Sequence, residues 1–363
     1  MKSKKNVIIV FCVITVLIIG AIVLINILKD KQSANTGTES SNFQIKENTV
    51  VSNNQENESD ESDKVDIIDV NSKSRPYAIV INNTPIAVKV QTGLNKAYIV
   101  YEIPTEGFTS RLMALFKDIP EDLTVGTIRS ARHNFIDYAL ESDAIFVHFG
   151  WSGVAEKQEK SGVIDYINGL FDTPFWRNNP ENLPSEHTAY TSINKLKQTI
   201  QAKNYRTELK DDNLISLLKY ASDEVDLSKE ANAEEANQIV IPYGDAPNIT
   251  SFIYDKDNKV YYRQENGNTC VDYNTKEKVN TKNIIVQKIT YEGIKNSKYL
   301  NLHTTGTGKG YYITNGYAVP ITWKKAKRNE KTRYYYSNGK EIKVNDGRTY
   351  IEIQTDKKEL TIK

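Results

Sequence analysis

The residues best suited to chemistry lie around Gly126–Arg132 (GTIRSAR), between a predicted strand end and a predicted helix start. Ser130 is expected to cap this helix, because a serine hydroxyl accepts a hydrogen bond from a free backbone N–H of the first turn. Arg129 and Arg132 flank the serine, and Arg111 opens another predicted strand. Free N–H groups, the positive helix end and guanidinium forks together favour a carboxylate or phosphate. We therefore predict an anion-binding site at these four residues.

Internal ion pairing is the alternative for the same arginines. Glu102, Glu106 and Asp137 are carboxylates that could neutralise them. Because ion pairs of this kind also have structural uses, both interpretations stay open.

A second group of residues could support nucleophilic catalysis. His148 ends an apolar segment and is followed by Phe-Gly-Trp and then Ser152, while His187 and Glu106 could complete a cleft. A hydroxyl beside an imidazole can act as a nucleophile with its base. The Gly-x-Ser-x-Gly elbow is absent, however, and no third orienting acid is identifiable. Buried, hydrogen-bonded histidines are the competing interpretation.

No metal or cofactor is expected from the sequence. A zinc site from His148, His187 and Glu106 would lack the H-E-x-x-H spacing. Cys12 lies in the apolar N-terminal stretch, so Cys270 is the only thiol of the body, and we expect it to be buried and structural. Lys and Arg number 47 against 46 Asp and Glu, and this near-neutral balance argues against nucleic-acid binding.

The N-terminal segment predicts a membrane anchor. Residues 6–28 carry no charge and are long enough to cross a bilayer as a helix. Lys2, Lys4 and Lys5 precede it, which favours a cytoplasmic tail at residues 1–5. The apolar run is too long for a cleaved signal, and Cys12 comes too early for a lipidated cysteine. We expect a single-pass protein of the cell membrane with an extracytoplasmic body.

The rest of the chain divides by composition into four parts. Residues 29–73 are rich in Ser, Asn, Glu and Asp without apolar periodicity, which predicts a disordered stalk. Residues 74–205 alternate strand-like and helix-like segments and predict an α/β domain. A charged connector with one amphipathic helix is expected at 206–238, followed by a β-rich domain at 239–363. The fold class is therefore α+β.

Individual elements follow from local patterns. Strands are expected at 77–82, 98–103, 111–117 and 144–149, helices at 131–141, 151–160 and 192–203, and the connector helix at 213–221. In the C-terminal domain, turn pairs such as Asn266-Gly267 and Asn315-Gly316 separate aromatic segments. These pairs are hairpin signals and predict an antiparallel arrangement.

Several motifs resemble the YerB-like family, a bacterial envelope group with a domain of unknown function. The motifs are RPYAIVINNTPIAVKVQTGLNKAYIVYEIPTEGFTSRLMALF, VGTIRSARHNFIDYA, DAIFVHFGWS and EHTAYTS, followed by SFIYDKDNKVYYR, NIIVQ, GYAVPITWKK and NGKEIKVNDGRTYIEI. The resemblance covers the chain from about Arg75 onward. It implies a surface protein of a Gram-positive-type bacterium, with an α/β domain before a β-rich one, and no established reaction. The lipobox usual in the family is absent.

Together these features favour a tethered envelope protein that binds an anionic wall component, such as peptidoglycan or teichoic acid, or a partner protein of the envelope. A cell-wall hydrolase or transferase built on His148, Ser152, His187 and Glu106 is the alternative.

Overall fold

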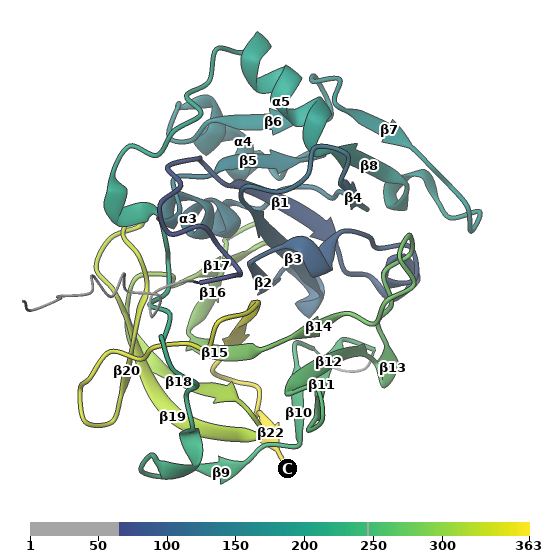
Figure 1. Ribbon diagram of the computed structural model, residues 1–363. Coiled ribbons are helices and arrows are strands. Elements are labelled where there is room, and N and C mark those ends of the chain that lie inside the picture. Colours follow the sequence, from purple (N-terminus) through teal and green to yellow (C-terminus); the bar gives the residue numbers. More distant parts are fainter. Residues whose placement is uncertain (1–64, 245–246) are drawn as a thin grey trace, which may run out of the picture. The chain divides into compact units, whose positions relative to one another are not determined.

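The centre of the body is a large sheet whose strands are rich in β-branched and aromatic residues, as expected of strands covered on both faces. The computed structural model describes residues 65–244 and 247–363, which belong to one compact unit, Asp60–Lys363 (Figure 1). The predicted tail, the membrane anchor and the stalk up to residue 64 lie outside the described residues. Across 65–244 and 247–363, no helix is long and apolar enough to span a bilayer.

Short strands and four helices build the N-terminal half. Its strands are β1 (Tyr77–Asn82), β2 (Ile99–Pro104), β3 (Ser110–Phe116), β4 (Thr124–Gly126), β5 (Ile145–His148), β6 (Tyr166–Asn168), β7 (Phe175–Arg177) and β8 (Ala189–Ser192). Its α-helices are α2 (Pro85–Val88), α3 (His133–Glu141), α4 (Gly153–Lys160) and α5 (Ile193–Ala202). The predicted strands and the three predicted helices of this half are confirmed to within two residues at each end.

The C-terminal half consists of strands. They are β9 (Glu234–Glu235), β10 (Gln238–Pro242), β11 (Ile249–Asp255), β12 (Val260–Glu265), β13 (Asn268–Thr269), β14 (Asn280–Thr281), β15 (Asn283–Ile289), β16 (Tyr291–Gly293), β17 (Leu300–Leu302), β18 (Gly306–Thr314), β19 (Tyr317–Lys325), β20 (Arg333–Tyr336), β21 (Thr349–Thr355) and β22 (Thr361–Ile362). Short 3-10 turns lie at Leu94–Lys96, Glu106–Phe108, Ser185–His187, Asp212–Leu214 and Leu227–Lys229.

One sheet of 11 strands runs through both halves, in the order β20-β19-β18-β15-β21-β2-β3-β1-β5-β6, with β9 beside β19. The N-terminal part is mixed, because β1 is antiparallel to β3 and parallel to β5. The C-terminal strands are antiparallel apart from the parallel pair β15 and β21. A second sheet, β13-β12-β11-β10-β22 with β14 beside β12, is antiparallel. The mixed N-terminal half and the antiparallel sheets that follow it confirm the predicted order of fold types.

The two halves meet where β21, near the end of the chain, pairs in parallel with β2. This pairing places Glu102 directly opposite Glu352. Side chains alternate between the two faces of each strand, so Tyr101 and Ile351 enter one hydrophobic core while Val100 and Tyr350 enter the other.

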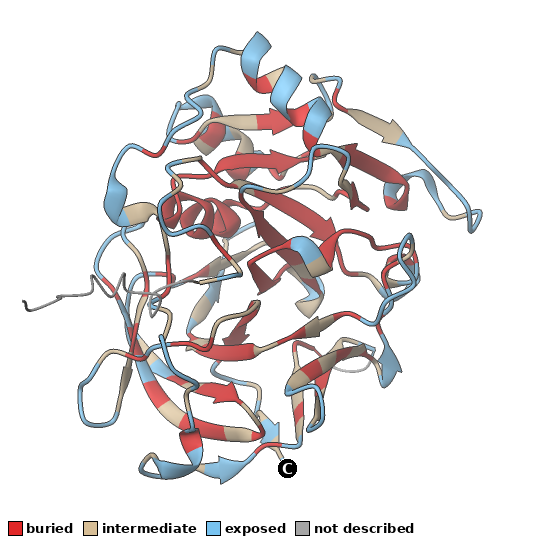
Figure 2. Cartoon of the chain, in the orientation of Figure 1, coloured by how far each residue is buried: buried red, intermediate tan, exposed pale blue. Residues whose placement is uncertain are grey.

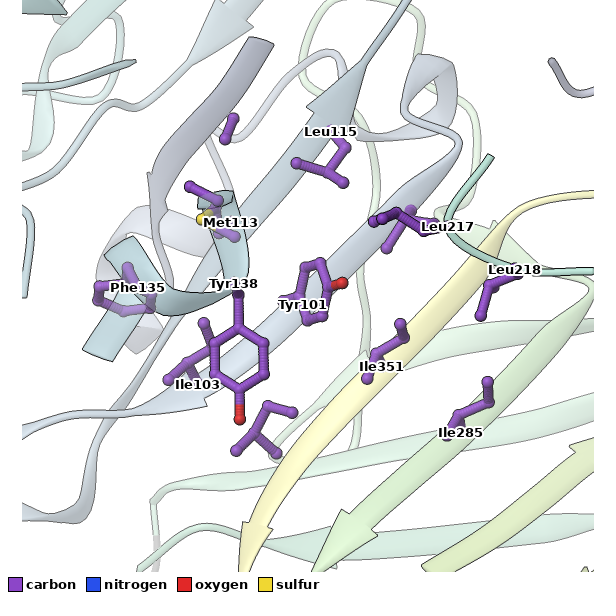
Figure 3. Close-up of a cluster of buried hydrophobic side chains, with 14 of the residues drawn as sticks. Tyr101, Ile103, Met113, Leu115, Phe135, Tyr138, Leu217, Leu218, Ile285 and Ile351 are labelled. Carbon is purple, nitrogen blue, oxygen red and sulfur yellow. The ribbon is translucent and has the colours of Figure 1, made fainter. Parts of the chain in front are cut away.

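These two cores lie on opposite faces of the large sheet, and the buried residues concentrate along its central strands (Figure 2). In the first core, side chains of α3 pack on β2, β3 and β21 (Figure 3). The labelled residues include Tyr101, Ile103, Met113, Leu115, Phe135, Tyr138, Ile285 and Ile351. The polar side of α3 is paired as well, since Asn134 Nδ2 donates to Leu300 O at 2.8 Å and Lys325 Nζ contacts Glu141 Oε1 at 2.5 Å.

Three local predictions differ from the structure. The expected helix at 213–221 is absent, and only the 3-10 turn Asp212–Leu214 forms in that stretch. Ser130 is not the cap of α3, because the helix begins at His133 with Arg132 in the capping position. Residues 65–73, predicted as the end of the stalk, contact the body: Ile68 is buried in the first core, and Asp346 Oδ1 accepts from Ile67 N at 3.1 Å.

Candidate functional site: three arginines around one carboxylate

An extended segment places the arginines between two parts of the large sheet. Arg129 N donates to Val80 O of β1 at 2.9 Å, and Arg129 O accepts from Phe149 N at 3.0 Å. Ala131 N then donates to Gly150 O at 2.9 Å. These backbone bonds fix residues 129–132 against the end of β5 before α3 begins.

Glu106 is the carboxylate that Arg132 and Arg111 share. Arg132 Nε donates to Glu106 Oε2 at 2.7 Å, and Arg132 Nη2 donates to Glu106 Oε1, which gives a forked pair. Burial alone would raise the pKa of Glu106, but the hydrogen bonds and charge of Arg132, with Arg111 beside it, lower this pKa to about 2. Glu106 is therefore ionised and cannot serve as a general acid at neutral pH.

Arg111 is the arginine with the least compensation. Its Nη2 lies 3.7 Å from Glu106 Oε1, and its Nη1 donates to the carbonyl of Ser130. Burial and the positive charge of Arg132 lower the pKa of Arg111 to about 9. It still carries its proton at neutral pH, in surroundings that disfavour its charge.

Arg129 lies at the rim. Its Nη1 donates to Glu186 O at 3.1 Å and its Nη2 lies 3.4 Å from Glu186 Oε1, whereas its buried Nε has no hydrogen-bond partner among the described residues. His187 follows, and its Nδ1 accepts from Asn82 Nδ2 at 2.7 Å. Burial and the charge of Arg129 lower the pKa of His187, so its ring is neutral at pH 7.

We call this group, Arg111, Arg129 and Arg132 with Glu106, Glu186 and His187, the arginine site. Three guanidinium groups face two carboxylates, one of them at the exposed rim. The internal pairing predicted as the alternative is thus present between Arg132 and Glu106, yet it leaves positive charge over. An arrangement with excess charge and fixed forks can bind an anion.

Ser130 joins this site through its backbone and not as a helix cap. Its hydroxyl donates to Phe149 O at 2.9 Å, and its carbonyl accepts from Arg111. The hydroxyl is therefore used to hold two loops together.

His148 and Ser152 lie outside the arginine site and make other contacts. His148 Nδ1 is 2.8 Å from Gly150 O and its Nε2 is 2.9 Å from Glu159 Oε2, both fully buried. Ser152 Oγ accepts from Ala155 N at 3.2 Å and caps α4. Of the four predicted catalytic residues, the structure brings together Glu106 and His187 with the arginines, and keeps His148 and Ser152 in these separate bonds.

Among residues 65–244 and 247–363, no three His, Cys, Asp or Glu side chains are grouped so as to hold a metal ion. Cys270 is buried as predicted, and burial raises the pKa of its thiol.

A second charged group was missed from the sequence. Arg263 Nη2 donates to Glu102 Oε2 at 2.9 Å and to Glu265 Oε2 at 2.8 Å. Glu352 is held by Tyr243, whose hydroxyl lies 2.7 Å from its Oε2. We call Glu102, Glu265, Glu352 and Arg263 the carboxylate cluster. The available signal was the pair Arg263 and Glu265, two apart on one face of a strand, but their partner Glu102 is 161 residues away from Arg263.

Protons must balance the carboxylate cluster, since three carboxyls share one guanidinium. Burial and the charge of Glu102 raise the pKa of Glu352 well above its ordinary value. Burial, together with the charge of Glu102 and against the attraction of Arg263, raises the pKa of Glu265 to about 7. Glu265 also borders a cleft of about 450 Å³ that Val88 and Asp272 help to line.

With the fold and the charged groups described, the chain can be assigned to a class. It belongs to the family described as protein of unknown function (DUF3048): residues 66–206 match its N-terminal domain and residues 239–351 its C-terminal domain. This confirms the family resemblance drawn from the motifs.

The similar proteins agree with this assignment. The chain is 34% identical over 282 residues to "Putative lipoprotein YerB" of Bacillus subtilis (strain 168), covering 76% of this chain and 78% of the relative. The crystal structure of the YerB protein from Bacillus subtilis matches with a TM-score of 0.70 and 31% identity, over 80% of this chain and 94% of that one.

Proposed function

We propose that this chain is a membrane-anchored envelope protein whose arginine site binds an anionic ligand outside the cell. The anchor part of the proposal rests on the uncharged segment 6–28 and its flanking lysines. The name of the relative, a lipoprotein, supports an envelope location for the family. Carboxylates of peptidoglycan and phosphates of teichoic acid are the anions that such a location would offer, and an acidic envelope protein would present the same groups.

One observation carries the binding proposal: Arg111, Arg129 and Arg132 lie together, and Glu106 and the exposed Glu186 neutralise only part of their charge. Buried charge without a partner costs free energy, and an incoming anion removes that cost. Arg129 is the most accessible of the three, because its side chain is 22% exposed, against 11% for Arg111 and 10% for Arg132, and it bonds to Glu186 at the exposed rim.

A binding measurement on the full-length chain in detergent micelles tests the proposal. We expect isothermal titration to detect binding of a glycerol phosphate oligomer or of soluble peptidoglycan fragments. Replacing Arg129 by Ala should weaken this binding about 10- to 100-fold, as expected for the loss of hydrogen bonds to a charged group. The affinity should also fall as salt is added.

Lys197→Ala is the matched control. Lys197 pairs with Glu121 on an exposed surface, so this substitution removes one positive charge and leaves the arginine site unchanged. Binding that is equally weak in both variants would mean that net charge alone is responsible. Unchanged binding in Arg129→Ala would remove the arginine site from the ligand.

A cell-wall hydrolase or transferase is the alternative proposal. It would draw on His187 and Glu106, because both ring nitrogens of His148 and the hydroxyl of Ser152 are engaged in buried hydrogen bonds. Mass spectrometry of cell-wall fragments incubated with the full chain would detect new products, and an activity that survives His187→Ala would exclude this residue.

A further inference from the structure

Two large apolar side chains lie exposed on a short loop beside the arginine site. Leu170 is 53% exposed and Phe171 is 68% exposed, in the loop that follows β6. We call residues 169–172 the aromatic loop. Contiguous exposed apolar side chains on a folded protein mark a surface that contacts something else.

The exposure is held in place by a network of hydrogen bonds. Asn168 Oδ1 accepts from Gly150 N at 2.9 Å and from Leu170 N at 3.1 Å, and Asn168 O accepts from Phe171 N at 2.9 Å. Gly169 N donates to His148 O at 3.0 Å. His148, which takes no part in the arginine site, thus helps to fix this loop.

An aromatic surface results. The ring centroids of Phe171 and Trp151 are 5.5 Å apart with planes tilted by 47°, and Trp151 is only partly buried. Lys160 Nζ lies 5.7 Å from the centroid of the Trp151 ring. The exposed ring of Phe171 is therefore supported from behind and offers a stiff apolar face.

Ser130 connects this surface with the arginines. A Cβ atom added to Gly150 would lie 3.0 Å from Ser130 Oγ and 4.0 Å from Leu170 Cδ1, so the two side chains lie close to the same point. The carbonyl of Ser130 accepts from Arg111. Ser130 therefore lies near Leu170 through its side chain and contacts the arginine site through its carbonyl.

The other side of the aromatic loop borders a depression of about 380 Å³ with a largely polar lining. Phe171 forms part of its wall, and Lys195, Gln198 and Lys203 supply polar groups. Lys203 Nζ is held 2.9 Å from Asp172 Oδ1. A ligand that crosses Phe171 would meet hydrogen-bonding groups there and not a continuous apolar groove.

We propose that the aromatic loop is the sugar-binding part of the site and that the ligand is an acidic glycan. The C–H face of a pyranose ring is apolar and packs on an aromatic ring, whose face is the negative end of its quadrupole. Its acidic substituent would bind the arginine site, and the hydroxyls of the next sugar would face the polar depression. This inference rests on the proposed function, because the arginines must hold the acid. The headgroup of an anionic lipid could bind the arginines and its acyl chain could contact the aromatic loop, but the acyl chain would make no hydrogen bonds in the polar depression.

Titrations of the full-length chain in detergent micelles with three probes test the inference. The probes are a muramic acid-containing oligosaccharide, the same oligosaccharide with its carboxyls reduced to alcohols, and inorganic phosphate. We expect Leu170→Ser with Phe171→Ser to weaken binding of the acidic oligosaccharide at least about tenfold, the loss expected from a stacked ring and its buried area. Phosphate affinity should stay within about twofold, because phosphate needs only the arginines.

Two controls separate stacking from stability. Phe171→Trp should keep the oligosaccharide affinity, since an indole offers the same kind of face. Val271→Ser removes an apolar side chain that is 37% exposed from the C-terminal half and should change nothing. Thermal unfolding of each variant shows whether it is folded.

The outcomes distinguish the two proposals. If the double variant binds the oligosaccharide like the wild type while Arg129→Ala loses it, the aromatic loop has no role and the arginine site stands. If neither variant is affected, both proposals fail. If brominated anionic lipids in vesicles quench the tryptophan fluorescence of the wild type but not of the double variant, the loop inserts into membranes and the glycan assignment is overturned.

Discussion

At the arginine site Arg111 and Arg132 share Glu106 while Arg129 pairs with Glu186, so three guanidinium groups face two carboxylates. In the carboxylate cluster Glu102 and Glu265 share Arg263, and Glu352 lies opposite Glu102 and is bonded to Tyr243. Each region has more charge of one sign than it can pair. The carboxylate cluster is buried between the two sheets: Arg263 and Glu352 are fully buried, and only Glu265 borders the cleft. The arginine site opens at its rim, where Arg129 meets Glu186.

The two regions differ in how their excess charge can be neutralised. Carboxyls in the cluster can hold protons, and the raised pKa values of Glu352 and Glu265 show that they do. Arginine cannot follow the same route near neutral pH, because even the lowered pKa of Arg111 is about 9. Protons can balance the excess negative charge inside the protein, whereas the excess positive charge of the arginine site is what the proposed anionic ligand would neutralise.

The largest expected effect comes from removing the cation of the carboxylate cluster. Arg263→Met should lower the free energy of unfolding by about 3–5 kcal/mol, because it leaves buried carboxyls with no positive partner. Urea unfolding followed by circular dichroism measures this. Lys197→Ala, which breaks an exposed ion pair, should cost no more than about 0.5 kcal/mol. A loss below 1 kcal/mol for Arg263→Met would show that protons alone can balance the cluster.

The pH dependence of Glu265 sharpens the same point. Its folded pKa of about 7 lies above the ordinary value of 4.5, so the folded state binds the proton more tightly. The resulting stabilisation, about 3 kcal/mol, is complete below pH 4.5 and is lost as the pH rises through 7. Unfolding curves of wild type and Glu265→Gln should therefore diverge between these values. Curves that stay parallel from pH 4.5 to 8 would contradict the raised pKa.

The pKa of Glu106 is shifted in the opposite direction from that of Glu265, and its expected effect on stability is smaller. Its folded pKa of about 2 lies below the ordinary value of 4.5, so its stabilisation is present above pH 4.5 and is lost as the pH falls towards 2. Glu106→Gln should lower stability at pH 7 by about 1 kcal/mol after solvent screening. It should also raise phosphate affinity a few-fold, because less of the positive charge is neutralised. A weaker affinity would mean that Glu106 positions the arginines and does not compete with the ligand.

The smallest effect is expected at His187. Burial and the charge of Arg129 lower its pKa below the ordinary value of 6.5, so the neutral form of the ring predominates above that pH. Anion affinity should then be flat between pH 6.5 and 8, and His187→Gln should change it by less than about twofold. An affinity that rises as the pH falls through this range, and loses that rise in the variant, would show that His187 is charged when ligand is bound.

Local patterns in the sequence identified the elements well where a segment's own residues decide its structure. The segment 77–82 is β-branched and forms β1, and residues 192–203 carry an apolar stripe that becomes α5. The helix prediction for residues 213–221 was wrong because the backbone there bonds to residues far along the chain instead of forming helical hydrogen bonds. Val344 O accepts from Ala221 N at 2.9 Å, and Val344 N donates to Lys219 O at 2.8 Å.

Part of the candidate site could be predicted from the sequence, because some of its residues lie close together along the chain. Arg111, Arg129 and Arg132 could be singled out because two of them flank a helix start, and their pairing with Glu106 was among the alternatives. The carboxylate cluster joins Glu102 with Arg263 and Glu352, residues that only the assembled sheet brings together. The aromatic loop gave no signal, since Leu and Phe next to each other predict burial and only the structure shows them exposed.

The parallel pairing of β2 with β21 has a consequence for folding. β21 ends at residue 355, yet it fills the middle of the large sheet between β15 and β2. Until β21 is in place, β2 has an open edge that can pair with the wrong strand. Truncation before residue 349 should therefore yield aggregates and not a smaller folded protein.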